Sequence, residues 1–522
     1  MTPTITTNVR DAAFALFRDF GMTTIFGNPG STELPMFRGF PDDFRYVLAL
    51  QESIAVAMAD GFAQTTGNAA LVNLHSAVGV GHALGNLFTA FRNRTPLVVV
   101  AGQQARSILP HFPFLYAEQA TEFPKPYVKY SVEPARAEDV PAAIARAFHI
   151  AMQPPRGPVF VSVPVDDWDR PCEKLPARRV SRTVRGDSAL LAELSAALAG
   201  ARSPVIVAGA EAARDGAWDE TIALAERHRA PVWASPMSSR NTFPEDHPLF
   251  AGFLTAGREP IVQALAGHDL ILVLGAPVFT YHVEGFGPFL PEGATLWQVI
   301  DDPALAAAAP VGTAIVGDIR DALATLLEGA APERPVPKAW VRPAPPPPEP
   351  LTDAYVFSRL AALRAPQSII VEEAPSARGP MHDFLPILAP DTFYTCASGG
   401  LGYSLPAAIG VAHGRPGEKV IALIGDGSAM YAIQALWSAA QLRLPISFLI
   451  LNNQRYEALI GFGRRFGLDR TIGTDLAGLD FVALAQGQGV AAVRVDSAAA
   501  LDAALAQSLA SPDPNLVEIL VA

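Results

Sequence analysis

Short apolar runs alternate with alanine-rich runs along almost the whole of this 522-residue chain. In the first third the apolar runs include RYVLAL (45–50), LVVVAG (97–102) and VFVSVP (159–164), and comparable runs recur in the other two thirds. Near-continuous apolar strands separated by helices are typical of a parallel sheet with helices on both of its faces. The pattern therefore predicts an α/β fold built on doubly wound parallel sheets.

Two changes in composition divide this pattern into three segments of similar size. In the first, CEKLPARRVSRTVRGDS, Pro and charged residues replace the apolar runs. The second, RPVPKAWVRPAPPPPEPLTD, has a Pro-rich centre that is typical of a stiff, extended linker. We therefore expect an N-terminal domain over residues 1–180, a central α/β domain over 185–334 and a C-terminal domain over 351–522.

Composition and charge exclude several classes of protein. The net charge is -12, and no basic stripe is available to neutralise phosphates, which argues against a nucleic-acid partner. No apolar run reaches the roughly 20 residues of a membrane span without a polar residue or glycine, and the first residues lack a signal-peptide layout. Cys172 and Cys396 cannot build a disulfide framework, so we expect a reducing, cytoplasmic location.

Two strand-like runs in the last third end in polar residues. VIALI is followed by Gly425, Asp426 and Gly427, and ISFLIL is followed by Asn452 and Asn453. Ligands of open parallel sheets lie beyond the carboxyl ends of the strands, so these side chains meet if the two strands are neighbours. Oxygen ligands suit Mg²⁺, which also takes ligands from bound phosphates, and a glycine turn before a helix suits a diphosphate. A Gly-Asp-Gly turn alone would also be ordinary turn chemistry.

A GDG sequence followed about thirty residues later by NN resembles the signature of thiamine diphosphate enzymes. GNPGSTELP, LALQES, NLHSAVG, LVVVAGQQ, GPVFVSVPVDDWD, GGLG and LPAAIG are similar to the benzoylformate decarboxylase group of that family, and the similarity spans nearly the whole chain. The resemblance implies the pyruvate decarboxylase-like fold, with thiamine diphosphate and Mg²⁺ as cofactors. The N-terminal domain would then bind the pyrimidine ring, and the C-terminal domain would bind the diphosphate and the metal.

The same resemblance assigns residues to the cofactor. It implies that Asp426, Asn453 and the backbone carbonyl of Arg455 bind Mg²⁺. It also implies that the carbonyl of Gly399 binds the pyrimidine amino group and that Leu401 holds the two cofactor rings in a bent form. The full set that it places against the cofactor is Glu52, Ser376, Gly399, Leu401, Gly425, Asp426, Gly427, Ser428 and Asn453.

Glu52 stands at the head of an apolar, helix-like run that begins just after RYVLAL. Taken alone, a carboxylate there is explained by the favourable interaction of a negative charge with the N-terminal end of a helix. In the family that the chain resembles, the matching glutamate hydrogen-bonds the aminopyrimidine ring and favours the tautomer that removes the C2 proton. The diphosphate signature downstream makes this catalytic role the stronger interpretation of Glu52.

Three further residues match positions that meet the substrate in the family. Ser31 in GNPGS matches a serine that contacts the substrate carboxylate, although a serine there could also cap a helix. His75 and His282 match histidines that transfer protons, a role that suits imidazole near neutral pH, although histidines near strand ends are often only packed side chains. The residues that match the lining of the substrate pocket are Thr395, Ala458, Leu459 and Phe462.

Two positions depart from the family pattern. Pro375 stands where a hydroxyl-bearing residue is expected beside the cofactor, although Ser376 follows it. Thr395 stands where the enzyme for aromatic acids carries phenylalanine. These departures leave the expected cofactor unchanged and bear on the identity of the substrate.

The resemblance implies decarboxylation of an aryl 2-oxo acid such as benzoylformate to an aldehyde and CO2, without oxidation. The same machinery would serve a carboligase or lyase acting on 2-hydroxy ketones or acyl-CoA compounds. A non-catalytic regulatory subunit is the third alternative, and loss of Glu52 or of the metal ligands would mark it. Sites in this family form between two subunits, so a homodimer is the minimum expectation and a homotetramer is expected by resemblance.

Overall fold

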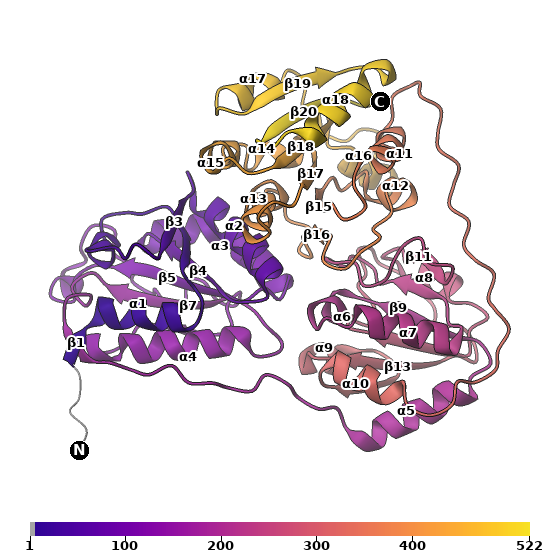
Figure 1. The fold of residues 1–522 in the computed structure, drawn as a ribbon, viewed down its shortest axis with the longest axis horizontal. Coiled ribbons are helices and arrows are strands. Elements are labelled where there is room, and N and C mark those ends of the chain that lie inside the picture. Colours follow the sequence, from indigo (N-terminus) through magenta and orange to yellow (C-terminus); the bar gives the residue numbers. More distant parts are fainter. Residues whose placement is uncertain (1–5) are drawn as a thin grey trace.

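The computed structural model describes residues 6–522, so the start of the predicted first domain at residue 1 lies outside the described residues. Figure 1 shows three α/β bodies arranged around a centre, and each contains a parallel six-stranded sheet. This confirms the predicted fold class of three doubly wound parallel sheets. A short antiparallel pair, β1 (Thr6–Asn8) with β8 (Pro171–Glu173), fastens the two ends of the first body together.

The first sheet has the strand order β3-β2-β4-β5-β7-β6. Its central strands are buried along their whole length, as the continuous apolar runs predict. The strands are β2 (Thr24–Gly27), β3 (Arg45–Leu48), β4 (Ala70–Leu74), β5 (Leu97–Gln103), β6 (Ser131–Val132) and β7 (Val159–Pro164). The helices are α1 (Val9–Asp19), α2 (Glu52–Thr66), α3 (Ser76–Arg92) and α4 (Val140–Met152).

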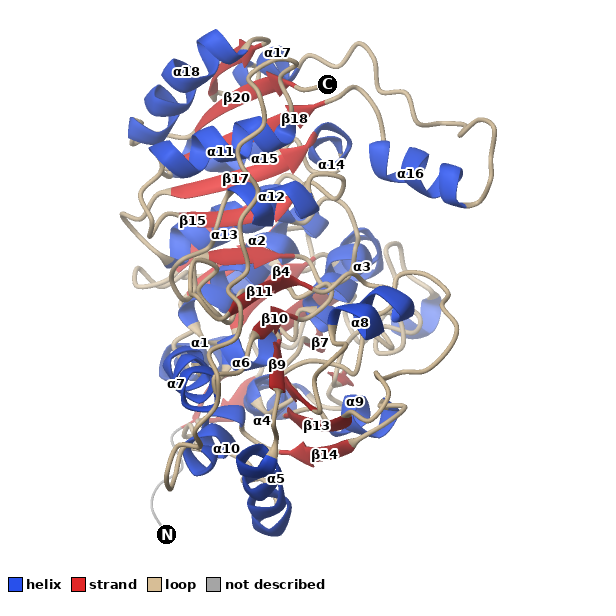
Figure 2. Cartoon of the chain, turned by 90° about the vertical axis from the view of Figure 1, so that its right-hand side faces the viewer, coloured by secondary structure: helices blue, strands red, loops and turns tan. Residues whose placement is uncertain are grey.

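The last sheet repeats the connectivity of the first, with the order β16-β15-β17-β18-β20-β19. Its strands are β15 (Ile369–Glu373), β16 (Phe393–Thr395), β17 (Val420–Gly425), β18 (Ile446–Asn452), β19 (Ala491–Val495) and β20 (Asn515–Leu520). Its helices are α11 (Asp353–Leu363), α12 (Arg378–Phe384), α13 (Ser404–Gly414), α14 (Asp426–Met430), α15 (Ala435–Leu442), α16 (Glu457–Arg465), α17 (Phe481–Gln486) and α18 (Ala498–Ala510). Figure 2 shows that α16 stands out from the body of the molecule on two loops.

The central sheet has a different order, β11-β10-β9-β12-β13-β14, which is that of a dinucleotide-binding fold. Its strands are β9 (Pro204–Ala208), β10 (Val232–Ala234), β11 (Phe250–Phe253), β12 (Leu270–Leu274), β13 (Thr295–Ile300) and β14 (Thr313–Val316). Its helices are α5 (Ser188–Gly200), α6 (Ala210–Arg214), α7 (Trp218–His228), α8 (Arg258–Ala264), α9 (Pro303–Ala308) and α10 (Ile319–Leu326). The Pro-rich linker then passes along the outer side of this domain to reach α11 (Figure 1).

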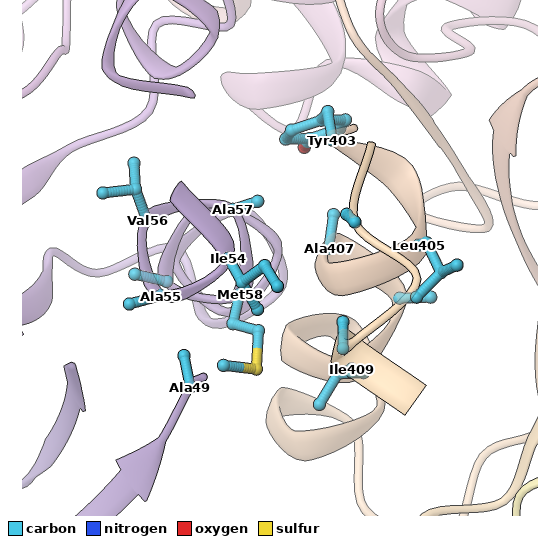
Figure 3. Close-up of a cluster of buried hydrophobic side chains, with 14 of the residues drawn as sticks. Ala49, Ile54, Ala55, Val56, Ala57, Met58, Tyr403, Leu405, Ala407 and Ile409 are labelled. Carbon is cyan, nitrogen blue, oxygen red and sulfur yellow. The ribbon is translucent and has the colours of Figure 1, made fainter. Parts of the chain in front are cut away.

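The first and last bodies share one hydrophobic core, in which α2 packs against α13. Figure 3 shows Ile54 and Met58 of α2 facing Ala407 and Ile409 of α13. The two backbones approach closely because a glycine lies at the crossing: a Cβ atom at Gly410 would stand 1.8 Å from the carbonyl oxygen of Met58. This packing fixes α2, which begins at Glu52, against the helix that follows the GGLG sequence.

Within residues 6–522, none of the helices combines the length and the apolar character that a transmembrane span requires.

Candidate active site

The carboxyl ends of β17 and β18 bring Asp426 and Asn453 together, because the two strands are neighbours in register. The backbone N–H of Arg455 donates to Asp426 Oδ2 at 3.2 Å and to Asn453 Oδ1 at 3.1 Å. Two side-chain oxygens therefore converge on one place, as the sequence predicts. The carbonyl of Arg455 accepts a hydrogen bond from the N–H of Glu457 at 3.1 Å, which leaves its second lone pair for another partner.

The chemistry of this set fits Mg²⁺. Asp426 is only 4% exposed, and burial raises the pKa of its carboxyl group because the charged form loses water. A divalent cation compensates such a desolvated charge, and carboxylate, amide and carbonyl oxygens are the ligands that Mg²⁺ prefers. The residues present can therefore hold the metal of thiamine diphosphate enzymes, with Asp426, Asn453 and the Arg455 carbonyl as ligands.

The GDG turn is shaped by a close approach that only glycine permits. A Cβ atom at Gly427 would stand 2.2 Å from Cε1 of the Tyr456 ring, whereas a Cβ atom at Gly425 would meet nothing closer than 3.8 Å. The N–H of Gly427 donates to Asp426 Oδ1 at 2.7 Å, and Ser428 is 4% exposed. Ser376, predicted to lie against the cofactor, is exposed in the turn between β15 and α12.

The loop before α13 carries Gly399 and Leu401. Gly399 is exposed and has a φ of +72°, a left-handed conformation that favours glycine, while Leu401 is partly buried. Glu373, at the end of β15, holds this loop by accepting hydrogen bonds from the N–H groups of the next turn. These groups are those of Gly402 at 2.6 Å, Tyr403 at 2.8 Å and Ser404 at 2.6 Å.

Glu373 is a residue that the sequence interpretation missed. Burial raises the pKa of its carboxyl group to about 7, although the three N–H groups work in the opposite direction. The available signal was an acidic residue at the end of an apolar run, in SIIVEEA, where a strand delivers it to the ligand edge of the sheet.

Glu52 is the first residue of α2 and is 8% exposed. Gln51, the residue before Glu52, caps this helix, because its side chain accepts from the N–H groups of Ser53 and Ile54. Glu52 Oε2 instead lies 3.1 Å from Nδ1 of His82 on α3. The carboxylate is thus turned toward α3 rather than bonded to the end of its own helix.

Asn86 of α3 joins the helix of Glu52 to the C-terminal domain. Its Nδ2 atom donates to the backbone carbonyl of Ser53 at 3.0 Å and to that of Gly402 at 3.2 Å. This side chain, 5% exposed, therefore ties the start of α2 to the loop that contains Gly399 and Leu401.

Ser31 and His75 lie on loops that follow the adjacent strands β2 and β4. Ser31 is exposed in its turn. His75 Nδ1 lies 2.9 Å from Glu33 Oε2 and 3.1 Å from Thr32 Oγ1. Glu33 also accepts the N–H groups of Gly30 and Gly102, so a buried carboxylate fixes the imidazole. The sequence interpretation missed Glu33, which stands two residues after Ser31 in the same motif.

His282 meets α16. Its ring packs edge-on against that of Phe462, with the ring centroids 4.8 Å apart. Ala458 is partly buried on the same helix, and Leu459 is 50% exposed. The structure therefore brings His282 of the central domain together with predicted pocket residues of the C-terminal domain.

Thr395 occupies a different setting from the other predicted pocket residues. It is 1% exposed, and its hydroxyl donates to Glu372 Oε2 at 2.9 Å and accepts from Arg378 Nη2 at 2.7 Å. The side chain is thus held inside a buried ion-pair network at the base of α12. Its role as a pocket residue stays a prediction.

The contacts described within one chain form two groups. One contains Glu52, His75 and the loop of Ser31, all in the N-terminal domain. The other contains Asp426 with Asn453, and His282 with Phe462, in the central and C-terminal domains. Hydrogen bonds through Asn86 connect the helix of Glu52 with the Gly399 loop.

Three domain families match the chain. They are the N-terminal TPP binding domain of thiamine pyrophosphate enzymes over residues 7–121, the central domain over 191–326, and the C-terminal TPP binding domain over 376–519. Thiamine pyrophosphate is another name for thiamine diphosphate.

Individual relatives are similar over nearly their whole length. A benzoylformate decarboxylase of Pseudomonas aeruginosa is 45% identical over 518 residues, which cover 98% of each chain. An acetolactate synthase large subunit of Haemophilus influenzae is 25% identical over 94% of this chain and 90% of its own.

Solved structures agree with this. The benzoylformate decarboxylase of Polynucleobacter necessarius superposes with a TM-score of 0.94 at 40% identity, covering 98% of each chain. The thiamine diphosphate-dependent 4-hydroxybenzoylformate decarboxylase of Rhodococcus jostii superposes with a TM-score of 0.95 at 42% identity, covering 99% of each chain. These matches, together with Glu52, the GDG turn and the two converging side-chain oxygens, show that this chain belongs to the thiamine pyrophosphate enzyme family.

Proposed function

We propose that this protein is a thiamine diphosphate-dependent decarboxylase that converts an aryl 2-oxo acid such as benzoylformate to the aldehyde and CO2. The observation that carries the proposal is the 45% identity to a benzoylformate decarboxylase over 98% of both chains. The reaction is a non-oxidative cleavage of a carbon–carbon bond, so the enzyme is a lyase.

The C-terminal domain would hold the cofactor by its charged end. Asp426, Asn453 and the Arg455 carbonyl would bind Mg²⁺, and the backbone from Gly425 to Ser428 would receive the diphosphate, with Ser376 nearby. The carbonyl of Gly399 and the side chain of Leu401 would contact its two rings. When bound, thiamine diphosphate supplies a carbon nucleophile and an electron sink for the carboxylate that leaves.

Glu52 would hold a proton at its carboxylate and share it with the pyrimidine ring of the cofactor. Its 8% exposure supports this role, because a carboxylate shielded from water makes stronger hydrogen bonds. The substitution Glu52→Gln keeps the shape of the side chain and removes the acid.

Ser31, His75 and His282 would meet the substrate. Glu33 holds Nδ1 of His75, so Nε2 is the atom left to give or take a proton. Ser31 would orient the substrate carboxylate, and His282 would act from beside Phe462, which its ring contacts. Phe462, Leu459 and Ala458 would supply apolar contacts for an aromatic side chain, and Thr395, held by Glu372 and Arg378, is the fourth residue proposed for the pocket.

We infer that the active unit contains at least two copies of the chain, in a homodimer or a homotetramer. Large apolar side chains on and just after α16 support this, because several are open to solvent in a single copy: Phe466 is 72% exposed and Ile472 is 85% exposed. Light scattering coupled to size exclusion would measure the mass. A monomer that retains full activity would contradict the inference.

The domain limits that we propose are 1–180 for pyrimidine binding, 185–334 for the central domain, and 351–522 for diphosphate and metal binding. We also propose a cytoplasmic location, which the two free cysteines support.

The test measures CO2 release from aryl and aliphatic 2-oxo acids, and compares metal-stripped protein with protein given thiamine diphosphate and Mg²⁺. The expected result is turnover of benzoylformate that requires both additions and is lost in Glu52→Gln. Turnover confined to aliphatic acids would reject the aryl substrate. No CO2 release from any acid, with cofactor binding demonstrated, would reject decarboxylation in favour of carboligation or lyase chemistry.

A further inference from the structure

His82 is the one side chain that hydrogen-bonds the carboxylate of Glu52 within the described residues. It lies on α3, its side chain is 55% exposed, and its Nδ1 atom is 3.1 Å from Glu52 Oε2. The carboxylate itself is nearly buried, with 10% of its side chain exposed. The exposed imidazole therefore covers one oxygen of an otherwise enclosed acid.

The chemistry of this pair fixes which atom donates. Oε2 carries no hydrogen when the shared proton of Glu52 is on Oε1 or on the cofactor ring, so Oε2 only accepts and Nδ1 of His82 carries the hydrogen. A hydrogen bond to a charged acceptor is short and directional, and it limits rotation of the carboxylate about its last bond. His82 thus selects Oε2 as the oxygen that it holds.

The other oxygen of Glu52 lies beside a glycine. A Cβ atom at Gly79 would stand 3.2 Å from both Cγ and Oε1 of Glu52, so a side chain at this position would crowd the carboxylate. With Oε2 held by His82 and no side chain at position 79, Oε1 is the oxygen left for a further donor.

We propose that His82 is a positioning residue for Glu52: its Nδ1–H holds Oε2, so that Oε1 is presented to the ring nitrogen of the bound cofactor. This proposal rests on the role of Glu52 in the proposed function. His82 itself need not touch the substrate, because it acts through the carboxylate.

Two substitutions separate the hydrogen bond from the bulk of the side chain. In His82→Asn, the amide Nδ2 is as many bonds from the backbone as Nδ1 of histidine, so a donor is kept in place. In His82→Leu, the shape is similar to asparagine but the donor is absent. His247 provides a control, because it also lies beside a glutamate, Glu226 at 3.3 Å, but in the central domain.

The first measurement is the rate at which the C2 proton of bound thiamine diphosphate exchanges with deuterated water, which needs no substrate. We expect His82→Leu to slow this exchange by roughly 10- to 100-fold, the factor that corresponds to one hydrogen bond to a charged group. His82→Asn should stay within about 3-fold of the unmodified protein, since it keeps that bond. His247→Leu should exchange at the unmodified rate. In turnover, His82→Leu should lower kcat and leave KM for the 2-oxo acid unchanged.

A second measurement uses the cofactor-free protein. Nitrogen NMR of labelled histidine should show the proton of neutral His82 on Nδ1, and Glu52→Ala should abolish that preference. The proposal would be overturned if His82→Leu exchanged the C2 proton at the rate of the unmodified protein, or if the Asn and Leu variants slowed the exchange equally. A proton on Nε2 of neutral His82 would also overturn it.

The outcomes also separate this proposal from the proposed function. If the variants exchange the C2 proton at rates in the predicted order but the protein releases no CO2, the role of His82 stands and decarboxylation is rejected. If Glu52→Gln exchanges as fast as the unmodified protein, Glu52 does not activate the cofactor, and the proposal fails with it.

Discussion

His75 Nδ1 lies 2.9 Å from Oε2 of Glu33, a carboxylate that is only 2% exposed. Because the carboxylate accepts from Nδ1–H, the imidazole is held in the tautomer that leaves Nε2 free of hydrogen. Glu33→Gln removes this preference for one tautomer of His75, since a carboxamide can donate as well as accept. We expect kcat for benzoylformate to fall by roughly 100-fold or more with little change in KM, up to the about 10⁴-fold loss of a triad histidine that loses its orienting carboxylate. Steady-state kinetics would measure both.

Thr32→Val provides the matched control for Glu33→Gln. Thr32 Oγ1 also contacts His75 Nδ1, at 3.1 Å, and donates to Glu33 Oε1 at 2.6 Å, but it carries no charge. We expect this variant to lose less than about 10-fold in kcat, since Glu33 Oε2 keeps its direct contact with His75 Nδ1. An unchanged kcat in Glu33→Gln, with a larger loss in Thr32→Val, would contradict the assignment of the carboxylate as the orienting group.

Gly427→Ala should weaken cofactor binding. Its Cβ atom would stand 2.2 Å from the Tyr456 ring, so the ring must move, and the ring follows directly after Arg455 in the metal loop. We expect affinity for Mg²⁺, measured at saturating thiamine diphosphate by calorimetry, to fall by at least about 10-fold, because Mg²⁺ tolerates little distortion of its ligands.

The other glycine of the GDG turn provides a control for this substitution. A Cβ atom at Gly425 would make only ordinary contacts at 3.8 Å, and its φ of -70° suits any residue. We therefore expect Gly425→Ala to retain more of the Mg²⁺ affinity than Gly427→Ala. Equal affinities in the two variants would show that the close approach of Tyr456 does not shape the metal loop.

Glu373 should make stability fall as pH rises through the acidic and neutral range. Burial raises the pKa of its carboxyl group to about 7, from an ordinary value of 4.5, so the folded protein keeps a proton that the unfolded chain releases. The contribution is fully present below about pH 4.5, declines between pH 4.5 and 7, and is lost above that. It amounts to roughly 3 kcal/mol across this window.

Glu373→Gln removes the titrating group, so thermal unfolding of the variant should depend less on pH between 5 and 7 than that of the unmodified protein. Comparing the two proteins isolates Glu373 from the other buried acids. A parallel pH dependence in both would contradict the raised pKa.

The sequence predicts the parts of this site that lie at strand ends. Gly425, Asp426 and Asn453 each follow an apolar run, and neighbouring parallel strands deliver such residues to the same edge. In the three large sheets, the short strands β6, β10, β11, β16 and β19 escaped prediction, because two to five residues carry little periodicity of their own.

Residues that act through another side chain could not be predicted in the same way. Glu33 and His75 are 42 positions apart, and Glu52 and His82 are 30 positions apart, so only the fold brings each pair together. Thr395 shows the opposite case, because the sequence suggests a pocket position while the fold encloses its hydroxyl between Glu372 and Arg378.

Phe462 should control the choice between aromatic and aliphatic substrates. Its ring packs edge-on against His282 at a centroid distance of 4.8 Å, so it both lines the predicted pocket and holds the histidine. Phe462→Leu keeps an apolar residue but removes the ring contact. We expect kcat/KM for benzoylformate to fall by about 10-fold, the factor for losing roughly 1.4 kcal/mol of contact, and that for an aliphatic 2-oxo acid to fall less. Phe466→Leu is the control, because Phe466 stacks on Phe462 with the ring centroids 6.3 Å apart and is 72% exposed. An equal loss for both classes of acid in Phe462→Leu would show that the ring positions His282 without selecting the substrate.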